Sequence, residues 1–121
     1  MHNITDVSEL TAFVASRPKL FVLSGAGCST SSGIPDYRDD RGQWKRSPPM
    51  ELRQFLGSAA ARQRYWARSF VGWTQFQAAK PSRAHYALLA LEEAGHVRCL
   101  VTQNVDGLHS RAGSGSVIDL H

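Results

Sequence analysis

Two short polar segments carry the residue types that could bind a phosphorylated ligand. The first is the Gly25-Ala26-Gly27 turn, which follows the apolar run 20–23 and leads into hydroxyl side chains such as that of Ser29. Glycine lets the backbone approach a ligand closely, and the free N–H groups at a helix start attract negative charge. The turn is therefore typical of a pyrophosphate site. It also suits a loop with no ligand, since Thr30 stands where the dinucleotide fingerprint has its third glycine.

The second polar segment, Gln103-Asn104-Val105-Asp106, follows another apolar run at Leu100-Val101. Its end, Asp106-Gly107, could be a plain turn. Two polar segments that each follow an apolar strand nevertheless predict a nucleotide-handling chain with its chemistry at the strand ends.

A loop rich in glycine and proline spans about 33–50 and holds further candidates. Long loops in compact folds are usually functional. Asp36 could accept a hydrogen bond from an amide or serve as a turn residue. Arg38 could pair with a phosphate or be an exposed loop charge.

Three motifs, GAGCSTSSGIPDYR, TQNVDGLHSRAG and VIDLH, resemble those of the sirtuins, the NAD-dependent protein deacylases, in order and approximate spacing. The middle section, which contains RQRYWARSFVGW and the Ser82-Arg83-Ala84-His85 stretch, is most similar to the class II sirtuins. The resemblance covers the chain from about Lys19 to its last residue.

The resemblance implies NAD as the cofactor and a cofactor-binding loop over 25–45. It puts Tyr37 over the nicotinamide and its ribose, Gln103 and Asn104 on that ribose, and Asp106 on the carboxamide. These roles suit the side chains, because a carboxylate accepts from an NH2 group and a side-chain amide can bridge ribose hydroxyls. The implied cofactor-binding set is Gly25, Ala26, Gly27, Ser29, Asp36, Tyr37, Arg38, Gln103, Asn104, Val105 and Asp106.

The resemblance also implies a general base. Asp119-Leu120-His121 matches the family motif whose histidine acts on the ribose, and Asn104 is the second catalytic candidate. Histidine titrates near neutrality, which suits proton abstraction, an effect of about 10²–10⁴-fold in rate. By position alone His121 would be the frayed end of a chain. We expect His109 to be structural.

The expected activity is NAD-dependent protein lysine deacetylation or deacylation, in which nicotinamide leaves and the acyl group is transferred to ADP-ribose. The family also carries out mono-ADP-ribosyl transfer. A non-catalytic module that binds NAD or ADP-ribose is the alternative. The expected partners are proteins with acylated lysines, with no direct contact to nucleic acid or a membrane.

The resemblance implies further parts that these residues do not contain, namely a zinc module with two cysteine pairs and the remaining strands of the sheet. We therefore expect residues 1–121 to be the N-terminal portion of a sirtuin catalytic domain, ending at the catalytic histidine and inactive alone. Zinc is expected in the full-length parent, on ligands outside this chain.

Cys28 and Cys99 are the only cysteines of these 121 residues. We expect two reduced thiols and no metal site from them.

The composition of the 121 residues fits one domain or a piece of one. The apolar share is 42%, and no apolar run approaches the roughly 20 residues that span a bilayer. The N-terminus has the features of neither a signal nor a transit peptide, which predicts a cytoplasmic protein.

The charge is unevenly distributed along the chain, although the net charge is only +4. Between Arg41 and Arg83 there are nine basic residues, and Glu51 is the single acidic residue. Their scatter favours a solvated helical face over a patch that binds acidic partners.

The elements that position these motifs alternate between strands and helices. We expect strands at 19–24, 97–102 and 116–120, and helices at 6–17, at 58–73 as one or two, and from Ser82 to a stop at Gly95. The fold class is α/β, the N-terminal part of a Rossmann-like, doubly wound parallel sheet. A helical insertion at about 45–80 forms a small subdomain. The loops after the first two strands should meet where the strand order reverses.

Two sets of side chains are expected to face the core, one on each of the two later helices. The set on the first of these helices is Tyr65, Trp66, Phe70 and Trp73, and the set on the second is Ala84, Leu88, Leu89 and Leu91.

Tyr65 and Arg68 lie one helical turn apart and could jointly hold a carboxylate. Arg68 could instead belong to the basic face of the helix.

Overall fold

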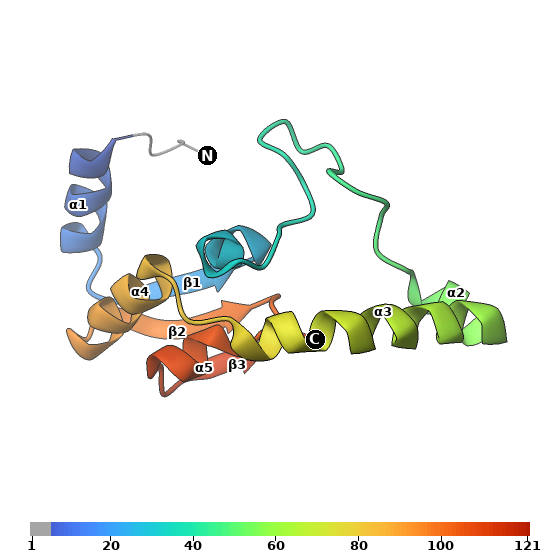
Figure 1. Cartoon of the computed structure of the whole chain (residues 1–121). Helices are drawn as coiled ribbons and strands as arrows, with labels where there is room; N and C mark the ends of the chain where they lie inside the picture. The colour runs from blue at the N-terminus through green and yellow to red at the C-terminus, as the bar shows by residue number, and fades with distance from the viewer. Residues whose placement is uncertain (1–5) are drawn as a thin grey trace.

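The computed structural model describes residues 6–121 and contains a parallel sheet of three strands. The strands are β1 (Leu20–Ser24), β2 (Val97–Thr102) and β3 (Val117–Asp119), and helices lie around them (Figure 1). The α/β class is confirmed. The bounds of β2 are as predicted, β1 begins one residue later, and β3 is one residue shorter at each end.

The strand order differs from the prediction. Within residues 6–121 the order is β1-β2-β3, so the strands follow the chain sequence without a reversal between β1 and β2. What brings the two polar segments together is the parallel register, in which Ser24 at the end of β1 pairs with Thr102 at the end of β2. The loops that leave these two strands therefore start side by side at one edge of the sheet.

The helices are α1 (Val7–Ser16), α2 (Leu52–Gly57), α3 (Ala59–Ala78), α4 (Arg83–Glu93) and α5 (Leu108–Ala112), with a 3-10 helix η1 (Ala26–Ser32) after the glycine turn. The side chain of Asp6 caps α1 by accepting from the Ser8 amide. The chain after α4 turns at Gly95, whose φ of 80° favours glycine. The helix α5 was not predicted, because its five residues carry too little periodicity to reveal a helix.

The small core lies at the junction of η1, the end of α3 and α5. Ile34, Ala79 and Leu108 are buried against one another, and Phe76 packs on them. Leu100 of β2 is also fully buried. These side chains anchor the last turn of α3 beside the two polar loops.

The aromatic stripe of α3 is exposed, and the prediction that it packs in the core is wrong. Phe70 is 83% exposed, and Tyr65, Trp66 and Trp73 are each at least 42% exposed. The reason is visible in Figure 1, where α3 extends away from the sheet and carries α2 at its far end. The ring of Phe55 in α2 meets Tyr65 and Trp66 edge to face, at centroid distances of 5.2 and 6.4 Å.

The inward face of α4 also differs in part from the prediction. Ala84 is exposed, whereas Leu88, Leu89 and Leu91 are half-buried as expected. The residue that enters the interior is His85, which is fully buried. The first turn explains this, because the Ser82 amide donates to His85 Nδ1 at 2.9 Å and thereby fixes the ring at the start of the helix.

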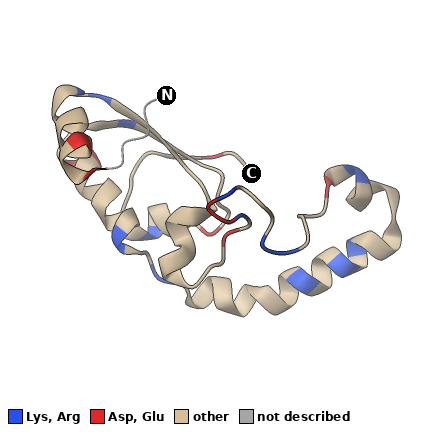
Figure 2. Cartoon of the chain, turned by 90° about the horizontal axis from the view of Figure 1, so that it is seen from above, with Lys and Arg blue, Asp and Glu red and all other residues tan. Residues whose placement is uncertain are grey.

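The basic residues of 41–83 do not form one compact patch. Figure 2 shows Lys and Arg spread along α3, α2 and the preceding loop. Arg62 is part of the local structure, since Nη1 donates to the carbonyls of Phe55 and Leu56 at 3.0 Å each. Within residues 6–121, none of the helices has the length and apolar character needed to cross a membrane.

Candidate functional site

A pocket of about 190 Å³ lies between η1, the loop that follows it and the loop after β2. It brings together residues that are as much as 95 positions apart, because the register of β1 and β2 sets their carboxyl ends level. The lining consists of Ala26, Ser29, Ile34, Pro35, Tyr37, Phe76, Gln103, Asn104, Val105, Asp106 and His121. Most of the residues that the sequence singled out therefore share one cavity.

Ser29 is the central group of this site. It is fully buried, and its hydroxyl donates to Asp106 Oδ2 at 2.6 Å. The hydroxyl oxygen of Ser29 also accepts from Asn104 Nδ2 at 3.2 Å. Asn104 Nδ2 also reaches the carbonyl of Gly25 at 3.0 Å. The glycine turn and the loop after β2 are thus joined by side chains of both motifs.

Asp106 and Gly107 do form a turn, as the plainer interpretation held. Asp106 Oδ1 accepts from the Leu108 amide at 2.9 Å, and Gly107 has a φ of 67° at the start of α5. The turn leaves the other carboxylate oxygen, Oδ2, on the Ser29 hydroxyl. The structural role of Asp106 and a position in the pocket wall are therefore compatible.

A second polar layer lies beneath the pocket. Ser24 Oγ donates to Thr102 Oγ1 at 2.9 Å and contacts His109 Nε2 at 2.8 Å. Thr102 Oγ1 in turn accepts from the Asn104 amide at 3.1 Å. Ser24 thus supports the loop from below and does not line the pocket. The burial and contact of His109 agree with the structural role expected for it.

Sequence reasoning missed the part played by His85. Its Nδ1 accepts from the Ser82 amide, so a neutral ring carries its proton on Nε2. That nitrogen lies 3.5 Å from Ser29 Oγ. The Ser82 hydroxyl donates to the carbonyl of Cys28 at 3.0 Å, which ties α4 to η1. The spacing Ser82-x-x-His85, a capping pattern, was the available signal.

The two buried histidines are held in their neutral forms. Burial lowers the pKa of His85, and the charge of Asp106 opposes this only in part. Burial also lowers the pKa of His109, helped by the neighbouring His85. Burial raises the pKa of the Cys28 thiol, and Asp106 adds to the effect. These groups therefore act as hydrogen-bonding neutral groups near neutral pH.

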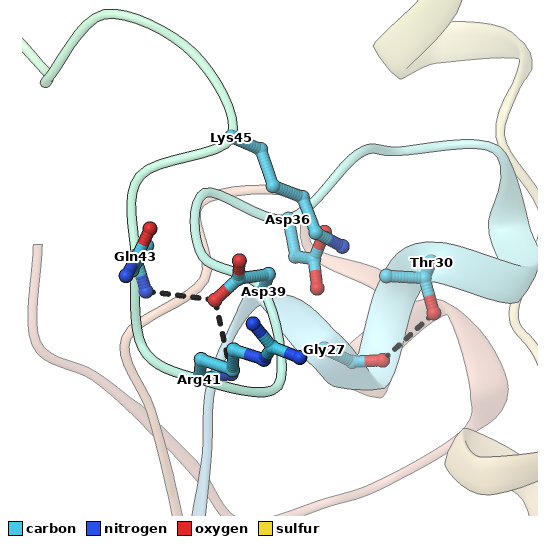
Figure 3. A network of polar contacts seen from close by, with 7 residues as sticks. All are labelled: Gly27, Thr30, Asp36, Asp39, Arg41, Gln43 and Lys45. Carbon is cyan, nitrogen blue, oxygen red and sulfur yellow. Dashed lines mark hydrogen bonds and ion pairs between the residues drawn. The ribbon is translucent and has the colours of Figure 1, made fainter.

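Asp36 and Arg38 lie outside the pocket lining and order the loop after η1. Asp36 pairs with Lys45 at 2.7 Å. Arg38 donates to the Gly42 carbonyl at 2.7 Å, and its guanidinium lies 3.8 Å from the centre of the Trp44 ring. Figure 3 shows the same loop folded around Asp39, whose carboxylate accepts from the Arg41 and Gln43 amides. Tyr37, between the two, does line the pocket.

The two glycines of the turn differ in what the chain requires of them. The Gly25 carbonyl is used internally, by Asn104 Nδ2 and by the Cys28 amide. Gly27 has no left-handed φ, and a Cβ there would meet no atom of residues 6–121 within 4 Å. Neither packing nor backbone conformation explains Gly27 in this chain. A ligand that approaches the backbone at this point would explain it.

His121 reaches the pocket because the pairing of β3 with β2 continues beyond the strand. The Leu120 amide donates to the Thr102 carbonyl at 3.0 Å. This contact holds the chain end against β2, and the exposed His121 side chain forms part of the pocket wall. An imidazole, a carboxylate and a side-chain amide thus line one cavity, which is a set suited to binding a polar ligand and moving a proton.

A larger apolar cavity of about 480 Å³ adjoins this pocket, with Phe76 and Val105 in the walls of both. Tyr65 and Arg68 both lie in its wall, so the helical spacing does bring this pair to one cavity. The remaining lining residues are Met50, Ser69, Gly72 and Trp73.

Comparisons with known proteins give consistent results. The model of the Sir2 family matches residues 25–121. The NAD-dependent protein deacetylase of Bordetella pertussis is 56% identical over 118 residues, which cover 98% of this chain and 43% of that protein. The NAD-dependent protein deacetylase of Xanthomonas campestris pv. campestris is 59% identical over 112 residues, covering 93% and 38%.

A solved structure of a Sir2–p53 peptide–NAD+ complex superposes with a TM-score of 0.80 and 34% sequence identity. The match covers 97% of this chain and 46% of that one. The chain thus spans less than half the length of the relatives that it matches. Since the family model includes the glycine turn, the loop after β2 and His121, the chain belongs to the Sir2 family, the sirtuins.

Proposed function

We propose that a protein of the relatives' length that contains this chain is an NAD-dependent protein lysine deacylase, for which residues 1–121 supply much of the NAD site and the general base. The observation that carries the proposal is the pocket in which Ser29, Asn104 and Asp106 are hydrogen-bonded to one another beside His121. The family membership and the names of the relatives support it.

The residues of the pocket fit the parts of NAD by their chemistry. Gly27 offers an open backbone approach for the pyrophosphate, beside the start of η1. Gln103 and Asn104 carry amide groups that could bridge ribose hydroxyls, and Asp106 Oδ2 could accept from the carboxamide. Asp36 and Arg38 would act by holding the loop that carries Tyr37 over the nucleotide.

Bound NAD would supply a nicotinamide leaving group and the ADP-ribose that accepts the acyl group. The chain's own part is to bind, orient and move a proton. His121 would take the proton from a ribose hydroxyl, and Asn104 would orient that ribose, held itself by the Gly25 carbonyl and Ser29. Closure of the loop containing Tyr37 would keep water from the reacting carbon.

We further propose acylated lysine side chains as the substrates. The apolar cavity that shares Phe76 and Val105 with the pocket would hold the acyl chain close to the ribose. Tyr65 and Arg68 in its wall would favour an acyl group that ends in a carboxylate. The related structure with a p53 peptide and NAD+ supports a peptide substrate.

The same proposal extends to the organisation of the protein. Residues 1–121 would be the N-terminal portion of the catalytic domain, and the helical segment at about 45–80 would be a small subdomain inserted into the sheet. A structural zinc ion would be bound outside this chain, which holds only two cysteines. The protein would be cytoplasmic.

The experiment uses a chimeric protein in which residues 1–121 are followed by the remaining part of the Bordetella pertussis relative. We expect it to deacetylate an acetyl-lysine peptide in an NAD-dependent manner. In the chimera, His121→Ala should lower turnover by about 10²-fold or more, while NAD binding is largely retained, because a general base acts on the transition state.

The control is His96→Ala, which changes a half-buried histidine outside the pocket and should retain turnover. A folded chimera that binds NAD but releases no nicotinamide would support the non-catalytic module instead. Transfer of ADP-ribose to the peptide would identify the transferase. Full turnover by the His121→Ala chimera would remove His121 from the mechanism.

A further inference from the structure

Three potential metal ligands from three separate elements meet beneath the pocket. They are Cys28 of η1, His85 of α4 and His109 of α5, and one ligand atom from each lies within 4.8 Å of the other two. We propose that these residues form a binding site for a divalent transition-metal ion of the zinc type, which cross-links the three elements. This site is separate from the zinc module expected outside the chain.

Two of the three residues are buried, and Cys28 is half-buried. His85 and His109 are 0% and 2% exposed, with ring centroids 4.7 Å apart. Among residues 6–121, no hydrogen-bond partner exists for His109 Nδ1, although it is buried. A buried ring nitrogen without a partner is unfavourable, because it has given up its hydrogen bonds to water and gained none in the folded chain. Coordination of an ion by this nitrogen would remove the deficit.

The distances are close to those of a metal site. Zinc binds sulfur at about 2.3 Å and imidazole nitrogen at about 2.0–2.1 Å, so tetrahedral ligands lie about 3.5 Å apart. The separations of up to 4.8 Å therefore require side-chain movements of only about an ångström. One thiolate and two imidazoles are a ligand set that zinc and its neighbours in the transition series prefer.

The charges balance when an ion binds. The Cys28 thiol would lose its proton to solvent as the metal–sulfur bond forms, and His109 would donate the lone pair of Nδ1 without releasing a proton. His85 would bind through Nε2 after its proton moves to Nδ1, where it would be donated to the Ser82 hydroxyl oxygen 2.8 Å away in exchange for the hydrogen bond from the Ser82 amide. The carboxylate of Asp106 acts electrostatically on all three groups and supplies a second negative charge. A doubly charged ion would thus be neutralised by its surroundings, with its fourth position open to water.

The sequence spacing conceals this site. Cys28 and His85 are 57 positions apart, and His109 follows 24 positions later, so no ligand pair has the close spacing of a zinc motif. The parallel pairing of β1 and β2 and the packing of α4 against β2, η1 and α5 bring them together.

The test titrates Co²⁺ and then Zn²⁺ into the metal-free chain of 121 residues, which lacks any cysteine-rich module. Wild-type protein should bind one Co²⁺ and show a thiolate-to-cobalt charge-transfer band in the near ultraviolet, which Zn²⁺ then removes. Cys28→Ser should lose the band, and Cys99→Ser, the matched control, should keep it. His109→Gln should weaken Co²⁺ binding at least tenfold.

Zn²⁺ should also raise the urea midpoint of the wild type and the Cys99→Ser variant, because an ion that binds only the folded chain stabilises it. The wild-type titration can refute the proposal alone, whether or not a variant folds. Absence of the band in the wild type, or its loss in Cys99→Ser, would overturn the site. Retention of the band in Cys28→Ser would overturn it equally.

Discussion

A single hydroxyl group, that of Ser29, joins two loops that are far apart in the sequence. It donates to Asp106 and accepts from Asn104, and no water reaches it, because its side chain is fully buried. A hydrogen bond to a partly buried carboxylate is stronger than one between neutral groups and holds its partners in one geometry. The candidate site therefore depends on the hydroxyl of Ser29, which the sequence already placed among the cofactor-binding candidates.

We predict that Ser29→Ala lowers the free energy of unfolding of the chimera by about 1–3 kcal/mol, because it removes a donor from a partly buried carboxylate. Ser31→Ala is the control, since Ser31 is exposed on the same 3-10 helix. Urea unfolding of both variants gives the difference. Equal losses in the two variants would mean that the Ser29 contacts contribute nothing specific.

A second prediction concerns Asp106. Asp106→Asn should weaken the response of the chimera to nicotinamide about tenfold, equivalent to about 1.4 kcal/mol, because a charged acceptor becomes a neutral group that also donates. Nicotinamide-exchange assays measure this effect. Asp40→Asn alters an exposed carboxylate of the neighbouring loop and should leave exchange unchanged. An unaltered response in Asp106→Asn would exclude this side chain from nicotinamide binding.

Many of the residues that line the pocket could be predicted from the sequence, because they follow apolar strands and the strand ends of a parallel sheet lie together. Ala26, Gln103 and Asp106 are examples. Phe76 could not, because its contacts depend on how α3 reaches the sheet. An aromatic residue near helical spacing looks the same in sequence whether it packs or is exposed.

At the scale of elements, strands were more predictable than helices. Leu100 and Val101 form an apolar run in a sheet that buries them, so β2 was predicted to the residue. The helix α3 has an apolar stripe, and along most of its length α2 is the element that this stripe meets. Periodicity therefore predicted correctly that the helix exists, but the prediction that the stripe packs in the core was wrong. Hydrophobic periodicity reports which face is apolar, and a partner must be known before that face can be called core.

The start of α5 provides an element-scale prediction. Gly107 has a φ of 67°, and its turn presents Asp106 to the pocket. Gly107→Ala should destabilise the chimera by about 1–2 kcal/mol, because the left-handed conformation brings a Cβ too close to the following carbonyl. The effect is measured as a lower thermal midpoint.

Gly57→Ala is the matched control for this change. Gly57 ends α2 with no left-handed φ, and a Cβ there would meet no atom of residues 6–121 within 4 Å. That variant should be neutral or slightly more stable, because alanine restricts the unfolded chain. A loss of stability as large as that of Gly107→Ala would contradict the proposed strain at Gly107.

The whole molecule, as described by residues 6–121, has an unusual balance of core and surface. Its fully buried side chains are few, whereas large apolar residues such as Phe21, Phe70 and Trp73 are more than half exposed. Exposed apolar surface of this extent normally marks a face that another part of a protein covers. The relatives are more than twice as long as this chain, which agrees with such a covering.

We therefore predict that the purified chain of 121 residues is inactive and incompletely protected. Within residues 6–121, β3 pairs on one side only, and parallel sheets are stable when helices and further strands cover them. His121 lies two residues beyond β3 and is exposed, so its side chain is not held within the roughly 0.5 Å that a catalytic base requires. Hydrogen exchange should show weak protection in β3 and stronger protection in β2, with no detectable deacylation. Strong protection of β3 together with NAD-dependent turnover would instead identify these 121 residues as a minimal enzyme.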